Sequence, residues 1–365
     1  MRARRRLAVF ASLFLLAILL TAGLWPFHIP RNQVSWIPDR PGLRLGARST
    51  LGSTASLDPL NSASCTVELW LRPKTGAAIA TLLAFYGPSG IAGISFHQSL
   101  TDLRLDRTSP GRTRDKRYIE NVLRSGKVVF FTVVSTPTGT AVYRDGKPLW
   151  NARAFRPDQP DCAGHFVVGD SPVEDDGWEG DLYGLAVYHR ELSSFEITAS
   201  HRAWMADNGP SALLPAPDVL YRFTERRGSV VHSLGIANVS LSIPAKYGIA
   251  RPTLLASPWK PSEEIWDDYP DIFLNIAGFV PFGFTMSVLF ALLQRKDAAR
   301  LALLSGVAVS AAIEILQFWL PTRNSDSRDI LTNGFGTAIG VFLYRRFIRW
   351  RPLPDWSSHG SHRAK

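Results

Sequence analysis

The chain lacks the short patterns by which many enzymes are identified from sequence. It contains no G-x-S-x-G, no H-E-x-x-H and no P-loop, so serine-hydrolase, zinc-protease and phosphate-loop chemistry find no support. The formal net charge is +10, but the basic residues form no stripe with interleaved aromatics and no nucleic-acid motif. We therefore expect no nucleic-acid partner, and no catalytic residue is assigned.

Residues 28–265 also lack any apolar run that could cross a bilayer, whereas both ends of the chain carry such runs. A basic segment, 1–6, precedes the first run, 7–25. Three further runs occupy 271–293, 299–320 and 329–348, each close to the ~20 residues that span a bilayer as a helix. The 365 residues are enough for two domains. We therefore predict four transmembrane helices, one for each run, and a separate domain, 26–265 with its linker, between the first helix and the second.

The N-terminal run has two interpretations. A basic start followed by apolar residues is also the pattern of a signal peptide. The run is long for such a peptide, lacks a convincing A-x-A cleavage site, and its LTAG segment is followed by leucine, so it is no lipoprotein site. We favour an uncleaved first helix.

The middle of the chain is rich in short alternating segments separated by Gly, Pro, Asp and Asn. These segments are 66–71, 79–86, 128–134, 140–144, 165–169 and 182–188. Such spacing is typical of an antiparallel sandwich or jelly roll. A single helical stretch, 192–206, stands out, and the prolines of 251–265 predict a linker.

The only two cysteines, Cys65 and Cys162, both lie in this middle domain. They could be two buried free thiols. An extracytoplasmic location would instead permit a disulfide between them, although the sequence alone does not show that they are adjacent.

Polar residues in the C-terminal helices recur at helical spacing. Asp271 and Asn275 share one face, Glu314 and Gln317 another, and Asp329 and Asn333 a third. Polar groups in lipid are costly and normally face a bundle interior. Together with Arg323 and Asp326 in the preceding loop, they form a candidate polar site, in which the carboxylates could do acid–base work, hold a divalent ion or simply join the helices. Gly336 and Gly340 have the G-x-x-x-G spacing of a close helix contact.

The segments DIFLNIAGFVPFGF and EILQFWLPTRNSDSRDILTNGFGTAIG resemble the two signatures of the VanZ-like family of membrane proteins. The resemblance covers about 271–348, and WPF at 25–27 extends it to the first helix. It implies a membrane bundle whose activity is poorly defined, connected with glycopeptide-antibiotic resistance or envelope lipids.

The middle domain resembles the laminin-G/concanavalin A-like jelly rolls. CTVELWLRPK, the hairpin around YRDGK and the segment from Gly180 to Ile197 carry the resemblance, over roughly 42–205, and the sandwich core extends to about 250. Such domains often bind calcium, which makes Asp170, Asp175, Asp176 and Asp181 candidate ligands, although an acidic surface turn is the simpler interpretation. The paired-acid strand motif of jelly-roll glycosidases is missing, which argues against glycoside hydrolysis.

Lysine and arginine positions predict the orientation. Basic residues cluster in 1–6, in 295–300 and in the tail 349–365, together with Arg345 and Arg346 just before it. By the positive-inside rule both termini are cytoplasmic and the β domain is extracytoplasmic. The candidate polar site then lies in the outer leaflet.

We therefore expect a multi-pass protein of the bacterial plasma membrane. Its laminin-G-like domain would bind a cell-envelope glycan or protein, and its helices would contact membrane lipids. The alternative is a membrane enzyme that acts on a lipid-linked or glycolipid substrate through the outer-leaflet acids, with Arg323 holding an anion. We expect binding and not catalysis, with calcium as the one candidate cofactor.

Overall fold

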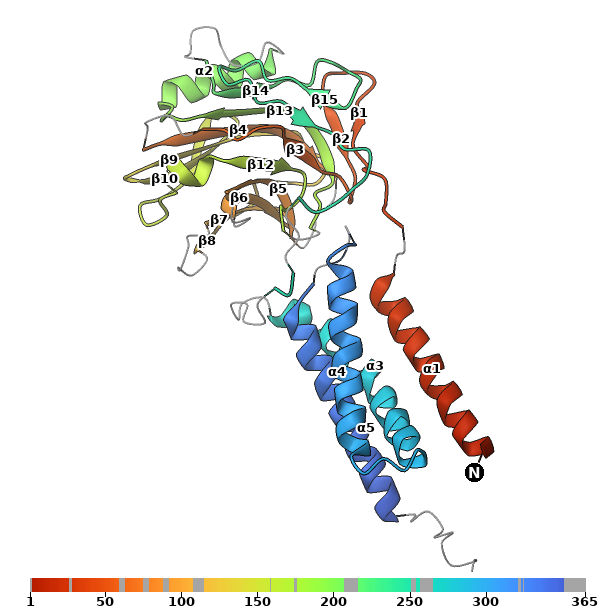
Figure 1. Cartoon of the computed structure of the whole chain (residues 1–365). Helices are drawn as coiled ribbons and strands as arrows, with labels where there is room; N and C mark the ends of the chain where they lie inside the picture. Colours follow the sequence, from red (N-terminus) through yellow and green to blue (C-terminus); the bar gives the residue numbers. More distant parts are fainter. Residues whose placement is uncertain are drawn as a thin grey trace, which may run out of the picture. The chain divides into compact units, whose positions relative to one another are not determined.

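The computed structural model describes residues 2–25, 28–58, 63–74, 79–87, 92–107, 115–157, 159–173, 176–206, 216–250, 254–256, 265–320, 323 and 325–350. The chain divides into two compact units (Figure 1). One comprises Met1–Phe27 and Thr253–Lys365 and is helical, and the other comprises His28–Pro252 and is built from strands.

The β unit is a sandwich of two eight-stranded antiparallel sheets. The first sheet runs β1 (Ser35–Trp36), β2 (Leu43–Leu45), β13 (Gly180–Tyr188), β4 (Cys65–Pro73), β9 (Val129–Thr136), β10 (Gly139–Arg144) and β11 (Lys147–Ala152), with β14 (Val219–Tyr221) also paired to β13. The second sheet runs β15 (Val230–Val231), β16 (Leu241–Ser242), β3 (Leu51–Ser53), β12 (His165–Val168), β5 (Ala80–Tyr86), β6 (Ala92–Ser99), β7 (Asp102–Arg107) and β8 (Asp115–Ile119).

Alternation along the strands sends every second side chain into the core between the sheets. On β4, Leu69 and Leu71 point inward, and on β7 Leu103 and Leu105 do so. A two-residue turn, Asp145-Gly146, joins β10 to β11. Both residues have positive φ, 52° and 74°. This is the Asp-Gly turn that a two-residue hairpin needs. The expected all-β jelly-roll domain is therefore present, and all six predicted segments are strands.

Helix α2 (Ser194–Met205) covers part of the outer face of the first sheet (Figure 1). It begins with a capping box, because Ser193 accepts from the backbone of Glu196 while the Glu196 side chain accepts from the backbone of Ser193. Ile197 and Trp204 pack with Trp70 and Phe130 of the sheet. A second, smaller apolar cluster thus fixes the helix on the sandwich.

The helical unit contains α1 (Arg2–Leu24), α3 (Ile265–Leu292), α4 (Ala298–Gln317) and α5 (Ser327–Trp350). Leu19 of α1, Phe279 and Phe282 of α3 and Ile313 of α4 form an apolar cluster that joins these three helices. Helix α3 begins six residues before the expected start, so Pro270 lies inside the helix, which costs that helix one backbone hydrogen bond.

Helices α3 and α5 approach closely through glycine. A Cβ on Gly336 would lie 2.3 Å from the carbonyl oxygen of Ile276, and one on Gly340 would lie 2.1 Å from that of Val280. Both distances are impossible for a side chain, so the contact requires glycine at both positions. The close helix contact predicted from the G-x-x-x-G spacing is confirmed.

Three of the described helices are long and apolar enough to cross a membrane, judged by length and composition alone. They are α1, the part of α3 from Pro270 to Leu292, and α4. Helix α5 carries Arg328 and Asp329 at its start and Arg345 and Arg346 near its end.

Candidate functional site

The predicted polar residues gather at one end of the helical unit, where α1 and α4 end and α5 begins. Glu314, near the end of α4, is 1% exposed, and its Oε2 accepts a hydrogen bond from the backbone N–H of Asp326 at 2.8 Å. The same loop is bound to the segment before α3, because the backbone N–H of Ala256 donates to the carbonyl of Ser325. Glu314 therefore fixes the turn that leads into α5.

Two of the predicted residues hold the end of α1. The side-chain amide of Gln317 donates to the carbonyl of Gly23 at 2.8 Å. The guanidinium of Arg323 donates through Nε and one Nη to the carbonyl of Trp25, at 2.9 and 2.6 Å. Under the enzyme alternative, sequence reasoning had Arg323 holding an anion, and in the structure two of its donors bind this backbone oxygen.

The remaining members come from α3 and α5. Asn275 lies within hydrogen-bonding reach of the Asp329 carboxylate, and Asp271 and Asp326 are near enough to act on it electrostatically. Asn333, one turn along α5, donates to Ser310 of α4 at 2.9 Å. All eight predicted residues thus lie in one polar region to which all four helices contribute.

Side chains of this region form contacts between helices and with the loop before α5. Glu314 and Asn333 are buried, and they bond to the loop before α5 and to Ser310 of α4, respectively, so both tie α4 to α5 or its preceding loop. The side-chain oxygens of Gln317 and Asn333 are buried and accept no hydrogen bond from the residues that the structure describes, which leaves acceptor capacity in the region.

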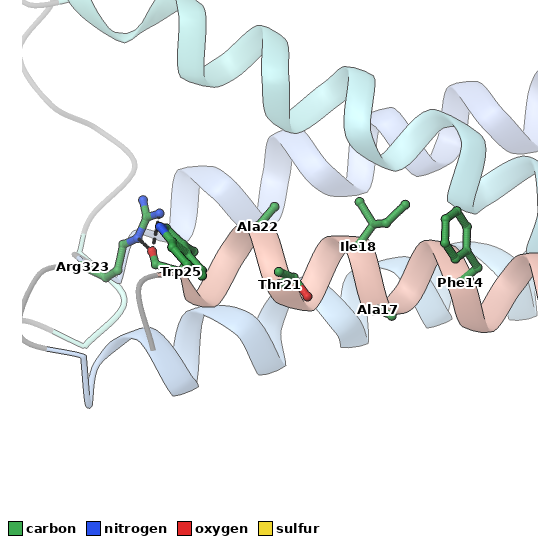
Figure 2. Close-up of a pocket in the computed structure, with 7 residues that line it drawn as sticks. All are labelled: Phe14, Ala17, Ile18, Thr21, Ala22, Trp25 and Arg323. Carbon is green, nitrogen blue, oxygen red and sulfur yellow. Dashed lines mark hydrogen bonds between the residues drawn. The ribbon is translucent and has the colours of Figure 1, made fainter. Parts of the chain in front are cut away.

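A groove runs along α1 beside this region. It has a volume of about 490 Å³ and is lined by Phe14, Ala17, Ile18, Thr21, Ala22, Trp25 and Arg323. Figure 2 shows these side chains along α1, with Arg323 and Trp25 together at its C-terminal end. The groove is apolar along its length and cationic at one end.

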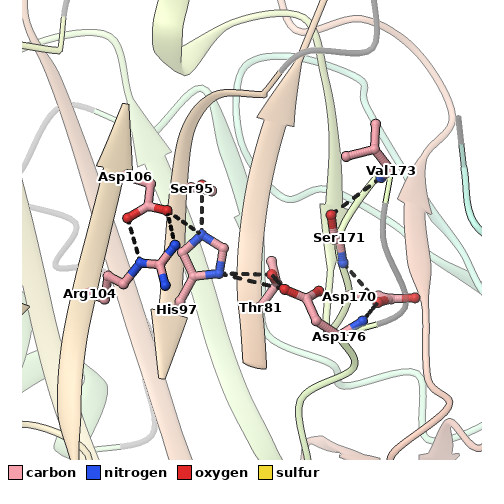
Figure 3. A network of polar contacts seen from close by, with 9 residues as sticks. All are labelled: Thr81, Ser95, His97, Arg104, Asp106, Asp170, Ser171, Val173 and Asp176. Carbon is pink, nitrogen blue, oxygen red and sulfur yellow. Dashed lines mark hydrogen bonds and ion pairs between the residues drawn. The ribbon is translucent and has the colours of Figure 1, made fainter. Parts of the chain in front are cut away.

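In the β unit, a polar network occupies the outer face of β5, β6 and β7 (Figure 3). His97 lies between Thr81 and Ser95, with ring nitrogens 2.9 and 2.8 Å from their hydroxyls. Arg104 binds both carboxylate oxygens of Asp106, which lies 3.6 Å from the His97 ring. Sequence reasoning missed this network, whose signal is polar residues alternating with core residues along β6 and β7.

The calcium candidates occupy different positions. Oδ1 of Asp170 accepts from the backbone of Ser171 and Asp176, and Oδ2 of Asp176 accepts from Thr81. Asp181 is bound by the guanidinium groups of Arg44 and Arg72, and Asp175 lies outside the described residues. Among the described residues no group of three or more His, Cys, Asp or Glu side chains is arranged to hold a metal ion. Calcium binding by this loop stays a prediction.

A buried carboxylate beneath α2 was also missed. Glu68 of β4 is fully buried, and its Oε2 accepts from Ser200, Trp204 and Tyr188 at 2.8, 3.1 and 3.3 Å. Burial raises the pKa of Glu68 to about 7, against the opposing effect of these hydrogen bonds. The available signal was a lone acid inside the apolar strand CTVELWL.

The two cysteines are joined. The structure contains a Cys65–Cys162 disulfide, with the two Cα atoms 6.6 Å apart. Cys65 begins β4 in the first sheet and Cys162 precedes β12 of the second sheet, so the bond crosses the sandwich.

Comparison with known families assigns both parts of the chain. The VanZ/LLP1 family model matches residues 219–349, and the model of the concanavalin A-like lectin/glucanases superfamily matches residues 47–198. The chain therefore combines a concanavalin A-like domain with a VanZ-like domain. The VanZ/LLP1 match begins at β14, so it includes the last strands of the β unit as well as α3, α4 and most of α5.

Several solved structures align with the chain at low identity and low TM-score. A native heptameric SAP-like pentraxin from Limulus polyphemus is 14% identical with a TM-score of 0.38, and the match covers 59% of this chain and 93% of that one. A putative carbohydrate binding protein from Bacteroides ovatus is 10% identical with a TM-score of 0.40, over 61% of this chain and 63% of that one. The CBM40 of Ruminococcus gnavus IT-sialidase is 10% identical with a TM-score of 0.34, over 44% and 96%. No curated protein matches the chain.

Proposed function

We propose that the protein is a membrane-anchored receptor of the bacterial cell envelope whose β unit binds a glycan. The observation that carries this proposal is the match of residues 47–198 to the concanavalin A-like lectin/glucanases superfamily, on a chain that folds there as a two-sheet sandwich. The missing glycosidase motif favours binding over cleavage.

The outer face of β6, β7 and β8 is the best place for such a ligand. Tyr118 of β8 is paired in register with Arg104 of β7, and its ring, 50% exposed, lies 6.0 Å from the Arg104 guanidinium carbon. The side chains of His97, Arg104 and Asp106 form a buried, mutually bonded layer beside this ring. A sugar presents an apolar C–H face and a hydroxyl edge, and an exposed tyrosine offers its ring to the first and its hydroxyl to the second.

A glycan array probed with the full chain in detergent tests the proposal. We expect at least one glycan to bind, and Tyr118→Ala to weaken that binding about tenfold, the loss of roughly one stacking contact. Phe195→Ala is the matched control, because Phe195 is an exposed aromatic on α2, outside this face. Absence of any bound glycan, or equal effects of the two variants, would overturn the proposal.

The helices would form a four-span anchor with both termini in the cytoplasm. In Figure 1 the N-terminus of α1, the α3–α4 connection and the far end of α5 lie at the same end of the helical unit. These places carry Arg2–Arg6, the cluster Arg295, Lys296 and Arg300, and Arg345 and Arg346. Basic residues of that kind are retained on the cytoplasmic side, so the residues of the polar region would lie in the outer leaflet.

A second function, binding of an anionic amphiphile by the helices, is favoured by the groove along α1. An acyl chain fits its apolar wall, and Arg323 at its end offers the guanidinium donors that Trp25 leaves unused. Native mass spectrometry of the full chain with phosphatidylglycerol and phosphatidylcholine tests it. We expect a preference for phosphatidylglycerol that Arg323→Gln removes, whereas equal retention of both lipids would exclude a headgroup site.

A further inference from the structure

Three charged residues form a row across the outer face of the first sheet. Arg44 of β2 and Arg72 of β4 are each paired in register with Asp181 of β13, which lies between them. Their neighbours Leu43, Leu71 and Leu182 point into the core, so the row faces outward, away from the other sheet. The row is set by backbone register and does not depend on a flexible loop.

The central carboxylate orients both guanidinium groups. Nε of Arg44 donates to Oδ1 of Asp181 at 2.9 Å, while Nε and one Nη of Arg72 donate to Oδ2. Burial opposes ionisation of Asp181, but the bonds from Arg44 and Arg72 outweigh it and hold the pKa of the carboxyl below its ordinary value. Asp181 is therefore ionised, and one negative charge is shared between two positive ones.

Most donors of the two arginines remain unused. A guanidinium has five N–H groups, and the described contacts use one on Arg44 and two on Arg72. The side chains are 55% and 42% exposed, whereas that of Asp181 is 6% exposed. An approaching ligand thus meets the cations and not the acid that holds them.

The row opens into a cleft of about 510 Å³. Its polar lining includes Gln33, Ser35 and Lys74 in addition to the row, and Lys74 also pairs with Glu179 at 2.7 Å. Arg40 stacks 4.0 Å above the ring of Tyr183, whose hydroxyl donates to Asp181, and adds a further positive charge on this face. The volume lies within the roughly 300–1,000 Å³ of small-molecule sites, so the cleft has room for a sugar unit and not only an ion.

We propose that this cleft binds an acidic sugar, by its carboxylate, sulfate or phosphate group, through Arg44 and Arg72. Planar guanidinium groups held in fixed orientation are suited to oxyanions, which accept two parallel N–H bonds from each. The proposal deepens the proposed function, since it names the charged part of a glycan ligand. The cleft lies on the sheet that does not carry Tyr118, so the two sites are tested separately.

The test compares dextran sulfate with uncharged dextran on the full chain in nanodiscs of phosphatidylcholine. We expect dextran sulfate alone to bind, with Arg44→Gln and Arg72→Gln each weakening it about tenfold, the loss of one charged hydrogen-bonding partner. Asp181→Asn keeps an acceptor for one of the two arginines, frees donors of the other and removes the competing charge, so it should strengthen binding severalfold. Lys147→Gln, which removes an exposed cation on β11, should leave binding unchanged.

Each outcome decides the proposal. Equal loss for Lys147→Gln and Arg44→Gln would mean that only overall charge matters, and unchanged binding in both arginine variants would place the site elsewhere. Unfolding midpoints identify variants that fail to fold, and the gain expected for Asp181→Asn cannot come from unfolding. Two results would overturn the sugar assignment. One is tighter binding to phosphatidylglycerol vesicles than to dextran sulfate, and the other is an affinity for free sulfate equal to that for dextran sulfate. Tyr118→Ala should leave dextran sulfate binding intact even if the proposed function fails.

Discussion

The carboxylate of Glu314 accepts a hydrogen bond from the backbone N–H of Asp326, with the two atoms 2.8 Å apart. The bond joins the last turn of α4 to the residue before α5. The acid is buried at the end of an apolar helix, where an unmade bond would be costly. Glu314 therefore has a structural role, because it holds the loop before α5 against the end of α4.

We predict that Glu314→Ala lowers the free energy of unfolding of the helical unit by roughly 2 kcal/mol, the cost of leaving the partly buried backbone N–H of Asp326 without an acceptor. Glu314→Gln should cost less, because its amide oxygen also accepts the bond. Leu316→Ala is the control, since Leu316 is an exposed residue of the same turn. Unfolding of the detergent-solubilised chain by SDS titration measures all three, and equal losses for Glu314→Ala and Leu316→Ala would refute the role.

Glycine substitutions should separate close helix contact from helix propensity. A Cβ at Gly336 or Gly340 collides with the backbone of α3, whereas one at Gly334 would lie 3.5 Å from a methyl of Val307, an ordinary contact. We expect Gly336→Ala and Gly340→Ala each to destabilise the helices by about 1–3 kcal/mol, and Gly334→Ala to have little effect. The same SDS titration measures this, and a neutral Gly340→Ala would contradict the contact.

The sequence predicted the elements because their physical signals are local. Alternation over 182–188 and a long apolar run over 299–320 are each readable without tertiary information. The grouping of Glu314, Asn333 and Asp329 followed from helical spacing and from the high cost of leaving polar groups in lipid.

The contacts of individual side chains were not predictable in the same way. That Arg323 binds the carbonyl of Trp25 depends on where α1 ends relative to a loop 298 residues away. The row of Arg44, Asp181 and Arg72 depends on strand order and register, because β13 lies between β2 and β4 although it follows both in sequence. Asp181 therefore resembled a metal ligand in the sequence and is an arginine partner in the fold.

The Cys65–Cys162 bond predicts a redox-dependent stability. The cysteines are 97 residues apart, and on the chain-entropy model a loop of this length contributes about 4.7 kcal/mol. We expect non-reducing peptide mapping of the native protein to recover one cross-linked peptide pair, and Cys65→Ser to lower the unfolding midpoint of the β unit by a large margin. Reductant should lower the midpoint of the wild-type protein only, and two alkylatable thiols in that protein would disprove the bond.

The orientation proposed for the helices predicts a simple alternating pattern. Reporter fusions after Gly42, Arg300, Asn324 and Arg351 should report outside, inside, outside and inside, because the basic clusters are retained in the cytoplasm. Replacing Arg4, Arg5 and Arg6 by Gln should weaken the orientation of α1, whereas Arg202→Gln in the β unit should not. A cytoplasmic signal from the Gly42 fusion would overturn the outer-leaflet location of the polar region.

Glu68 should make the β unit less stable as pH rises. Its pKa is about 7 in the folded protein, mainly because of burial, against 4.5 for the ordinary side chain. Below pH 4.5 the acid is protonated in both states and contributes no penalty. Between pH 4.5 and 7 the unfolded chain releases the proton first, so stability falls, and above pH 7 the loss levels off at roughly 3 kcal/mol.

Glu68→Gln should remove this loss, because glutamine keeps an acceptor for Ser200, Trp204 and Tyr188 and carries no charge. The variant is expected to be more stable than the wild-type protein at pH 8 and equal to it near pH 4.

Glu196→Gln is the opposing control. Burial favours its protonation, but bonds from Ser193 and Arg190 lower the pKa of Glu196, so this variant should lose stability above the ordinary glutamate pKa. Tryptophan fluorescence reports the unfolding, since Trp204 contacts Glu68. The prediction fails if, between pH 5 and 8, the unfolding midpoint of the wild-type protein does not fall relative to that of Glu68→Gln, because Glu68 would then be ionised without cost.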